Sequence, residues 1–304
     1  DLGWRTIFLI NLPVGAVAMA LGWRFLPVTR SRRAMRLDFV GFAYVVGATS
    51  LLLIGVIEGP NLGWPIWCWA ALAVSLCFAA LVWRHATRRI ARIGSAIIEP
   101  SLFGQRTFSF ALVSLVAFSA AAAGFLLVFA MGVQRGLGLT PFQTALLHIP
   151  FAAGVMLGVA VIGRRLVPIY GRWVVVGGSA LMATGCASVL VAIGTGDASW
   201  WLMIPLLLAS GTGMGLQAGP LPPIAVARVD ADHAGAASAM VKTAQQVGSA
   251  LGIAVTGAVY FGVAGTASGA TASHGAEAAM LPVAALLAAA LFGAAMLPRT
   301  IFPR

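Results

Sequence analysis

Long apolar runs separated by short polar connections dominate the sequence. A helix needs about 20 apolar residues to cross a hydrocarbon core of roughly 30 Å, whereas a transmembrane β-strand would show about ten residues of alternating polarity. Nine runs meet the helical requirement: residues 6–26, 38–57, 64–83, 108–131, 142–162, 173–194, 200–226, 234–262 and 279–298. The pattern predicts an all-α integral membrane protein with nine transmembrane helices.

Composition supports lipid as the solvent. Hydrophobic residues make up 60% of the 304 positions and charged residues 9%, whereas soluble domains carry about 25% charged residues. The net charge of +11 comes from arginine clusters between apolar runs and not from a basic helix face, so no nucleic acid partner is expected. Cys68, Cys77 and Cys186 lie inside apolar runs without C-x-x-C spacing, which indicates neither a disulfide framework nor a metal site.

The basic residues predict an orientation. If the nine helices alternate in direction, every Lys and Arg except Arg5, Arg135 and Lys242 lies in connections on one side, which the positive-inside rule assigns to the cytoplasm. We therefore expect a multi-pass protein of the plasma membrane, with the N-terminus of this chain outside and its C-terminus cytoplasmic. The connection from residue 84 to residue 107 alternates arginine with isoleucine, which fits either an amphipathic surface helix or a solvated basic linker.

Small residues repeat at steps of four in two consecutive runs. Such repeats let membrane helices approach closely, so the runs 200–226 and 234–262 are expected to cross each other. The two stripes are Gly211, Gly215 and Gly219 in the first run, and Ala244, Gly248, Gly252 and Thr256 in the second.

Prolines interrupt the end of the run 200–226. Pro220, Pro222 and Pro223 each lack the backbone donor that a regular helix requires. Transporters use such broken helices for gating, so Pro220 and the glycines before it are candidate gating residues.

Four segments resemble motifs of one family. They are the opening 3–15 (GWRTIFLINLPVG), 36–41 (RLDFVG), 99–103 (EPSLF) and the glycine-rich run 234–257 centred on QQVG. Together they resemble the fourteen-span drug:proton antiporters of the major facilitator superfamily, from their sixth helix to their fourteenth.

The resemblance implies an incomplete major facilitator fold. Residues 1–36 would be the last helix of the N-terminal bundle with its basic loop. Residues 37–106 would hold two linker helices and the cytoplasmic connection, and residues 107–304 a complete C-terminal six-helix bundle. The five preceding helices are absent, so the chain is expected to be a fragment. Its partners would be the bilayer, a small-molecule substrate and the missing N-terminal half.

The implied activity is secondary transport, with small amphiphilic compounds or drugs exported in exchange for protons. A proton gradient would drive it, and no cofactor is expected. One departure concerns the cytoplasmic loop 163–172, where Pro168 replaces an acidic residue and puts the loop's charge pair in doubt. Another is Lys242, at a position where relatives commonly have Asn.

Four polar side chains inside the predicted spans are candidates for the substrate or proton pathway. His148 is either a titratable group on that pathway or a neutral, hydrogen-bonded histidine near the interface. Gln217, Gln245 and Gln246 either bind a ligand or join helix to helix.

Two charged residues complete the set of candidates. Lys242 is expected in a polar cavity or at the cytoplasmic mouth, because a lipid-facing charge at that depth costs about 2.5–3.5 kcal/mol. Asp38 begins a run and is expected first to cap its helix. A packing role, together with gating, is expected for Gly211, Gly215, Gly219, Gly248 and Gly252.

Two alternatives to transport come from other functional classes. A membrane-embedded prenyl or acyl transferase needs clustered acids for metal–pyrophosphate binding, or a His paired with an acid. None of the eight acidic residues forms a D-x-x-x-D cluster within a span, so the chain is not expected to be an enzyme. An inactive, truncated membrane protein remains an open alternative.

Overall fold

The computed structural model describes residues 9, 11–25, 38–93, 96–196, 199–230 and 233–297. The chain divides into two units, residues 1–37 and residues 38–304. The regular elements within the described residues are all helical, as the sequence predicts. In the first unit, α2 (Asn11–Phe25) covers most of the predicted first span, whose two ends lie outside the described residues.

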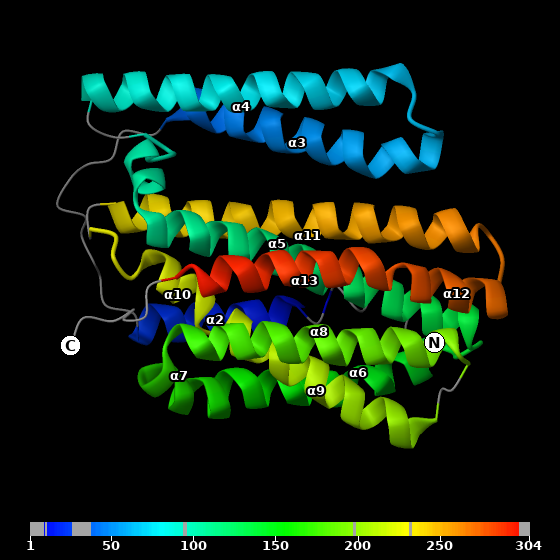
Figure 1. The fold of residues 1–304 in the computed structure, drawn as a ribbon. Coiled ribbons are helices and arrows are strands. Elements are labelled where there is room, and N and C mark those ends of the chain that lie inside the picture. The colour runs from blue at the N-terminus through cyan, green and yellow to red at the C-terminus, as the bar shows by residue number, and fades with distance from the viewer. Residues whose placement is uncertain are drawn as a thin grey trace. The chain divides into compact units, whose positions relative to one another are not determined.

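Eight helices in the described residues are long and apolar enough to cross a membrane. They follow the remaining predicted spans in order (Figure 1). Their segments are α3 (Phe39–Leu62), α4 (Ile66–Ile93), α5 (Arg106–Met131) with η2 (Gly132–Gly136), α6 (Pro141–Met156) with η3 (Leu157–Gly163) and α7 (Arg164–Tyr170), α8 (Arg172–Gly194), α9 (Trp200–Ala218) with α10 (Leu221–Val226), α11 (Ala234–Ala264), and α12 (Ala270–Ala278) with α13 (Met280–Ala295).

Three boundaries differ from the prediction. The helix α4 continues to Ile93, so the first half of the arginine–isoleucine stretch extends a span and is not a separate surface helix. The fifth predicted span continues through the π-helical η3 into α7, which ends at Tyr170. The last begins at Ala270, because α12 and α13 are separated only by Ala279. Hydropathy locates the apolar residues of a span, whereas the backbone hydrogen bonds of the helix continue into the residues that flank them.

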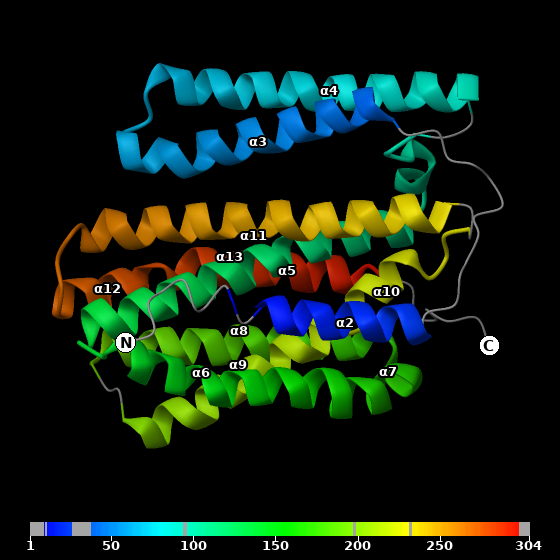
Figure 2. The same ribbon diagram turned by 180° about the vertical axis from the view of Figure 1, so that it is seen from behind.

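The second unit contains a helical hairpin and a bundle. Helices α3 and α4 lie side by side, and α3 also packs against α11 (Figures 1 and 2). In the bundle, α9 packs against both α6 and α8, while α5 packs against both α11 and α13. The connection between hairpin and bundle contains one short 3-10 helix, η1 (Pro100–Gly104).

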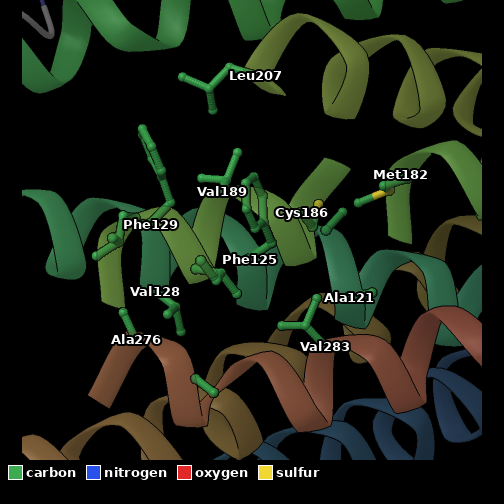
Figure 3. Close-up of a cluster of buried hydrophobic side chains, with 14 of the residues drawn as sticks. Ala121, Phe125, Val128, Phe129, Met182, Cys186, Val189, Leu207, Ala276 and Val283 are labelled. Atoms are coloured by element: carbon green, nitrogen blue, oxygen red, sulfur yellow. The ribbon is translucent and has the colours of Figure 1, made fainter. Parts of the chain in front are cut away.

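A buried apolar cluster fills the bundle where α5, α8, α9, α12 and α13 converge. Figure 3 shows Phe125 and Phe129 of α5 among Met182, Cys186 and Val189 of α8. The rings of Phe125 and Phe129 stack with centroids 5.9 Å apart. Cys68, Cys77 and Cys186 are free thiols.

Small residues bring helix backbones into contact in several places, and two of these seams lie on the predicted glycine stripes. On α11, a β-carbon at Gly248 would overlap the carbonyl of Val116, and one at Gly252 would overlap that of Ala120. One turn further along α5, a β-carbon at Gly124 would come within 2.6 Å of Thr256. The glycine stripe of α11 is therefore the contact face for α5.

The second seam joins α9 to α6. A β-carbon at Gly211 would overlap the carbonyl of Phe151, and one at Gly215 would overlap that of Val155. From the other side, Gly154 and Gly158 meet the backbone of α9 in the same way. The expectation that the two consecutive stripes pack on each other is wrong, because α9 packs on α6 and α11 packs on α5. Spacing along one helix marks a contact face but does not name the partner.

The seam predicts a large difference between two glycines of α11. Gly252→Leu should lower the free energy of unfolding by about 3 kcal/mol, because the new side chain collides with the backbone of α5. Gly262→Leu is the control, since a β-carbon at Gly262 meets nothing within 4 Å. Unfolding in mixed detergent, followed by circular dichroism, measures both, and equal stabilities would contradict the seam.

Candidate functional site

Two helices depart from regular geometry at the point where the α6–α9 seam ends. The first helix becomes π-helical over Leu157–Gly163. The second stops at Ala218, and α10 begins at Leu221 after a turn at Gly219 and Pro220. The break predicted from the prolines is confirmed, because a proline cannot donate the hydrogen bond that would continue the helix. Breaks in neighbouring helices at one level are typical of functional positions.

A cavity lies between these two broken helices. Its volume is about 310 Å³, at the lower end of the range for ligand sites. It contains the predicted gating residues Gly219 and Pro220. Its lining residues are Val159, Gly163, Arg164, Val167, Pro168, Gly219, Pro220 and Pro223. One cationic side chain and no acidic one belongs to this lining.

The loop 163–172, in which Pro168 replaces the acid of the expected charge pair, is held in place by a different interaction. Gly171, with φ of 53°, turns the chain from α7 into α8, a conformation that favours glycine. Arg172 then donates hydrogen bonds from one guanidinium nitrogen to the carbonyl oxygens of Ala295 (2.8 Å) and Leu297. A cation at the carboxyl end of α13 satisfies carbonyls that have no helical partner. This interaction of Arg172 does not require an acidic residue at position 168.

The pathway candidates lie apart from one another. His148 sits on α6, where its Nδ1 is 2.9 Å from the carbonyl oxygen of Thr144 and its ring meets Phe129 edge-on, with centroids 5.0 Å apart. Because a carbonyl oxygen only accepts, Nδ1 is the donor in this contact. This is the geometry of a hydrogen-bonded histidine, and a role in proton transfer stays a prediction.

The glutamines and Lys242 occupy different environments. Gln217 is completely buried on α9, and neither atom of its amide has a hydrogen-bond partner among the described residues. Lys242 and Gln246 are exposed on α11, and Gln245 is half-buried. Lys242 lies eight residues into α11, about 12 Å from its first residue. The structure does not gather these side chains into one site, so their part in a pathway stays a prediction.

Asp38 forms a buried ionic cluster at one end of the hairpin. Its Oδ1 accepts a hydrogen bond from the Gly41 N–H at 2.9 Å, which confirms the helix cap, and lies 2.9 Å from His85 Nε2. Its Oδ2 is 3.5 Å from Arg89 Nε and accepts a 3.4 Å bond from the Ile97 N–H. The side chain is only 5% exposed. The cluster joins α3, α4 and the connection to the bundle.

The electrostatics of this cluster favour the carboxylate. Burial by itself would raise the pKa of the Asp38 carboxyl, but the Gly41 N–H, His85 and Arg89 together hold that pKa below its usual value of 3.8. The ionised form is therefore the one that the fold stabilises. A place for Asp38 on a proton pathway stays a prediction.

Sequence reasoning missed a second carboxylate–histidine pair. Glu99 Oε2 lies 3.4 Å from His233 Nδ1, and Ser101 donates a 2.9 Å hydrogen bond to Glu99 Oε1. The pair joins the connection to the beginning of α11. Both acids stand inside the motifs 36–41 and 99–103, but their histidine partners are distant in sequence. The motifs could have drawn attention to the acids, whereas only the fold supplies the partners.

Comparison with known proteins identifies the family. The family model described as Major Facilitator Superfamily matches residues 1–253. The chain belongs to the major facilitator superfamily. It is 33% identical over 289 residues to a probable actinorhodin transporter of Streptomyces coelicolor. The aligned region covers 93% of this chain and 49% of that transporter.

Other members of the superfamily match in the same way. The chain is 29% identical over 262 residues to the multidrug resistance protein Stp of Mycobacterium tuberculosis, covering 84% of this chain and 47% of Stp. It is 29% identical over 289 residues to the puromycin resistance protein pur8 of Streptomyces alboniger, covering 93% and 54%. The chain therefore spans about half the length of these relatives. Membership makes it a multi-pass membrane protein and excludes the membrane-embedded enzyme.

The Asp38 cluster predicts a pH-dependent loss of stability. Asp38→Asn keeps a helix cap, because Asn and Asp cap equally well, but removes the charge. At pH 7 we expect a loss of about 2 kcal/mol. The loss should vanish as the pH falls from about 4 through the lower folded pKa, because the wild-type carboxylate is then protonated as well. Unfolding of both proteins across a pH series measures it.

The control is Glu58→Gln, at the other end of α3, which forms no ion pair with any described residue. It should change stability little at any pH. A loss in Asp38→Asn that is the same at pH 7 and at pH 2 would contradict a charge-based role for the cluster.

Proposed function

We propose that this chain is the C-terminal part of a secondary transporter that exports small amphiphilic compounds in exchange for protons. The observation that carries the proposal is the α6–α9 seam with its paired breaks and cavity. A glycine seam lets two helices slide or rotate without side-chain collisions, and breaks at its end let the terminal segments move separately. Alternating access involves rocking or gating of one helical repeat or bundle against another around a shared site.

The names of the relatives support the compound class. They concern actinorhodin, puromycin and multiple drugs, which suggests antibiotic-like substrates for the protein that contains this chain. Proton coupling requires a titratable group whose protonation shifts the balance between two conformations. His148, a titratable side chain on α6 inside the bundle, is our candidate. An inactive truncated protein is the alternative that the transport experiment decides.

The proposed site of action is the plasma membrane. The arginine asymmetry supports a cytoplasmic position for α7 and for the Asp38 cluster. It also supports an external position for the turn between α11 and α12. The N-terminus of the chain would then be outside and its C-terminus cytoplasmic.

Single cysteines test this orientation in intact cells. In a background lacking Cys68, Cys77 and Cys186, an impermeant thiol reagent should label Ser268→Cys but not Arg165→Cys. Both positions are exposed, so access depends on the side of the membrane. Labelling of both after the cells are permeabilised is the control, and the reverse pattern in intact cells would overturn the orientation.

Transport itself is tested in vesicles. Residues 1–304 alone should insert but not export a fluorescent cation, because they hold one bundle and alternating access needs two. The product of the complete reading frame that contains them should export it, and a protonophore should stop the export. Export by 1–304 alone would contradict the need for a second bundle, and a protonophore-insensitive full product would contradict proton coupling.

Two glycine substitutions test whether transport needs the α6–α9 seam. In the full product, Gly215→Leu should abolish export, because a side chain there collides with the backbone of α6. Gly177→Leu, on α8, should preserve export, since a β-carbon at Gly177 meets nothing within 4 Å. Equal export by both variants, at equal amounts of protein in the membrane, would show that export does not require the seam.

A further inference from the structure

The cavity between the broken helices combines an apolar interior with one cation at its edge. Val159, Val167 and three prolines supply apolar walls, and Gly163 and Gly219 leave the backbone close to the space. Arg164 is exposed and has no ion pair with any described residue. A ligand that fits this combination has an apolar body and an anionic head.

Helix geometry places that cation at the level of the lipid headgroups. Arg164 follows Pro141, the first residue of α6, by 23 positions, which is about 35 Å of helix. The hydrocarbon core is about 30 Å thick. Pro220 follows Trp200 by 20 positions, or about 30 Å, so the second wall of the cavity reaches the same boundary.

We propose that this cavity binds an anionic phospholipid. The phosphate would pair with the guanidinium of Arg164, and the upper part of an acyl chain would lie against Val159 and Pro220. An arginine in a groove between membrane helices at headgroup depth suits a lipid phosphate. The proposal does not depend on the transport activity or on the identity of an exported compound.

The apolar walls decide between a lipid and a free anion. A soluble phosphate would gain only one exposed ion pair, which is weak in water. A lipid adds the burial of its chain and is already concentrated in the bilayer. The cavity therefore favours a lipid over a free anion.

Native mass spectrometry of purified residues 1–304 in a neutral detergent tests the proposal. Phosphatidylglycerol should bind with a defined stoichiometry. Diacylglycerol lacks the phosphate and glycerol phosphate lacks the chains, so both should bind much more weakly. Arg164→Gln should weaken phosphatidylglycerol binding about fivefold, the effect of losing one arginine near a headgroup.

Two matched controls separate a site from general attraction. Arg165→Gln removes the adjacent exposed charge, which does not line the cavity, and should leave the affinity unchanged. Val159→Phe fills the cavity and should reduce binding, whereas Val161→Phe, also exposed but outside the lining, should not. Circular dichroism confirms that each variant is folded.

Three results would each overturn the proposal. Equal weakening by Arg164→Gln and Arg165→Gln would mean diffuse charge attraction. Equal binding of diacylglycerol would mean an apolar groove that ignores the phosphate. Binding of glycerol phosphate as tight as that of phosphatidylglycerol would mean a site for a free anion.

Discussion

Direct contact between helix backbones is the constraint on which this structure depends. Lipid tails are as apolar as the side chains, so no hydrophobic force draws membrane helices together, and close packing must supply the attraction. In the described residues, Gly248 and Gly252 bring α11 onto the carbonyls of α5, and Gly211 and Gly215 bring α9 onto those of α6. Large side chains at these positions would separate the helices.

The same constraint explains where the polar features lie. Helices α6 and α9 both depart from regular geometry near the end of the seam that joins them. There η3 becomes π-helical, α9 gives way to α10, and the cavity opens beside Arg164. Polar interactions hold the neighbouring connections. Arg172 binds the carboxyl end of α13. Asp38 joins the hairpin to the connection that follows it, and Glu99 joins that connection to the beginning of α11. Backbone contact therefore fixes the interior of the bundle, and separate polar interactions hold its ends.

Much of the fold could be predicted from residue patterns. Hydropathy located the spans because each must satisfy its own backbone in lipid, and the prolines near residue 220 located the break because they lack a donor. Asp38 was expected to cap a helix and does so. The pattern failed on one pair of partners, because the stripes of α9 and α11 do not meet.

The sequence by itself therefore determined the solvent, the class, the spans and the faces that pack, because these follow from the polarity and size of residues near one another in the chain. Only the tertiary structure decided which face meets which, how Asp38 finds His85 and Glu99 finds His233, and where a cavity remains. Those outcomes depend on how whole helices fit together. Residue spacing along one helix carries no information about the helix on the other side.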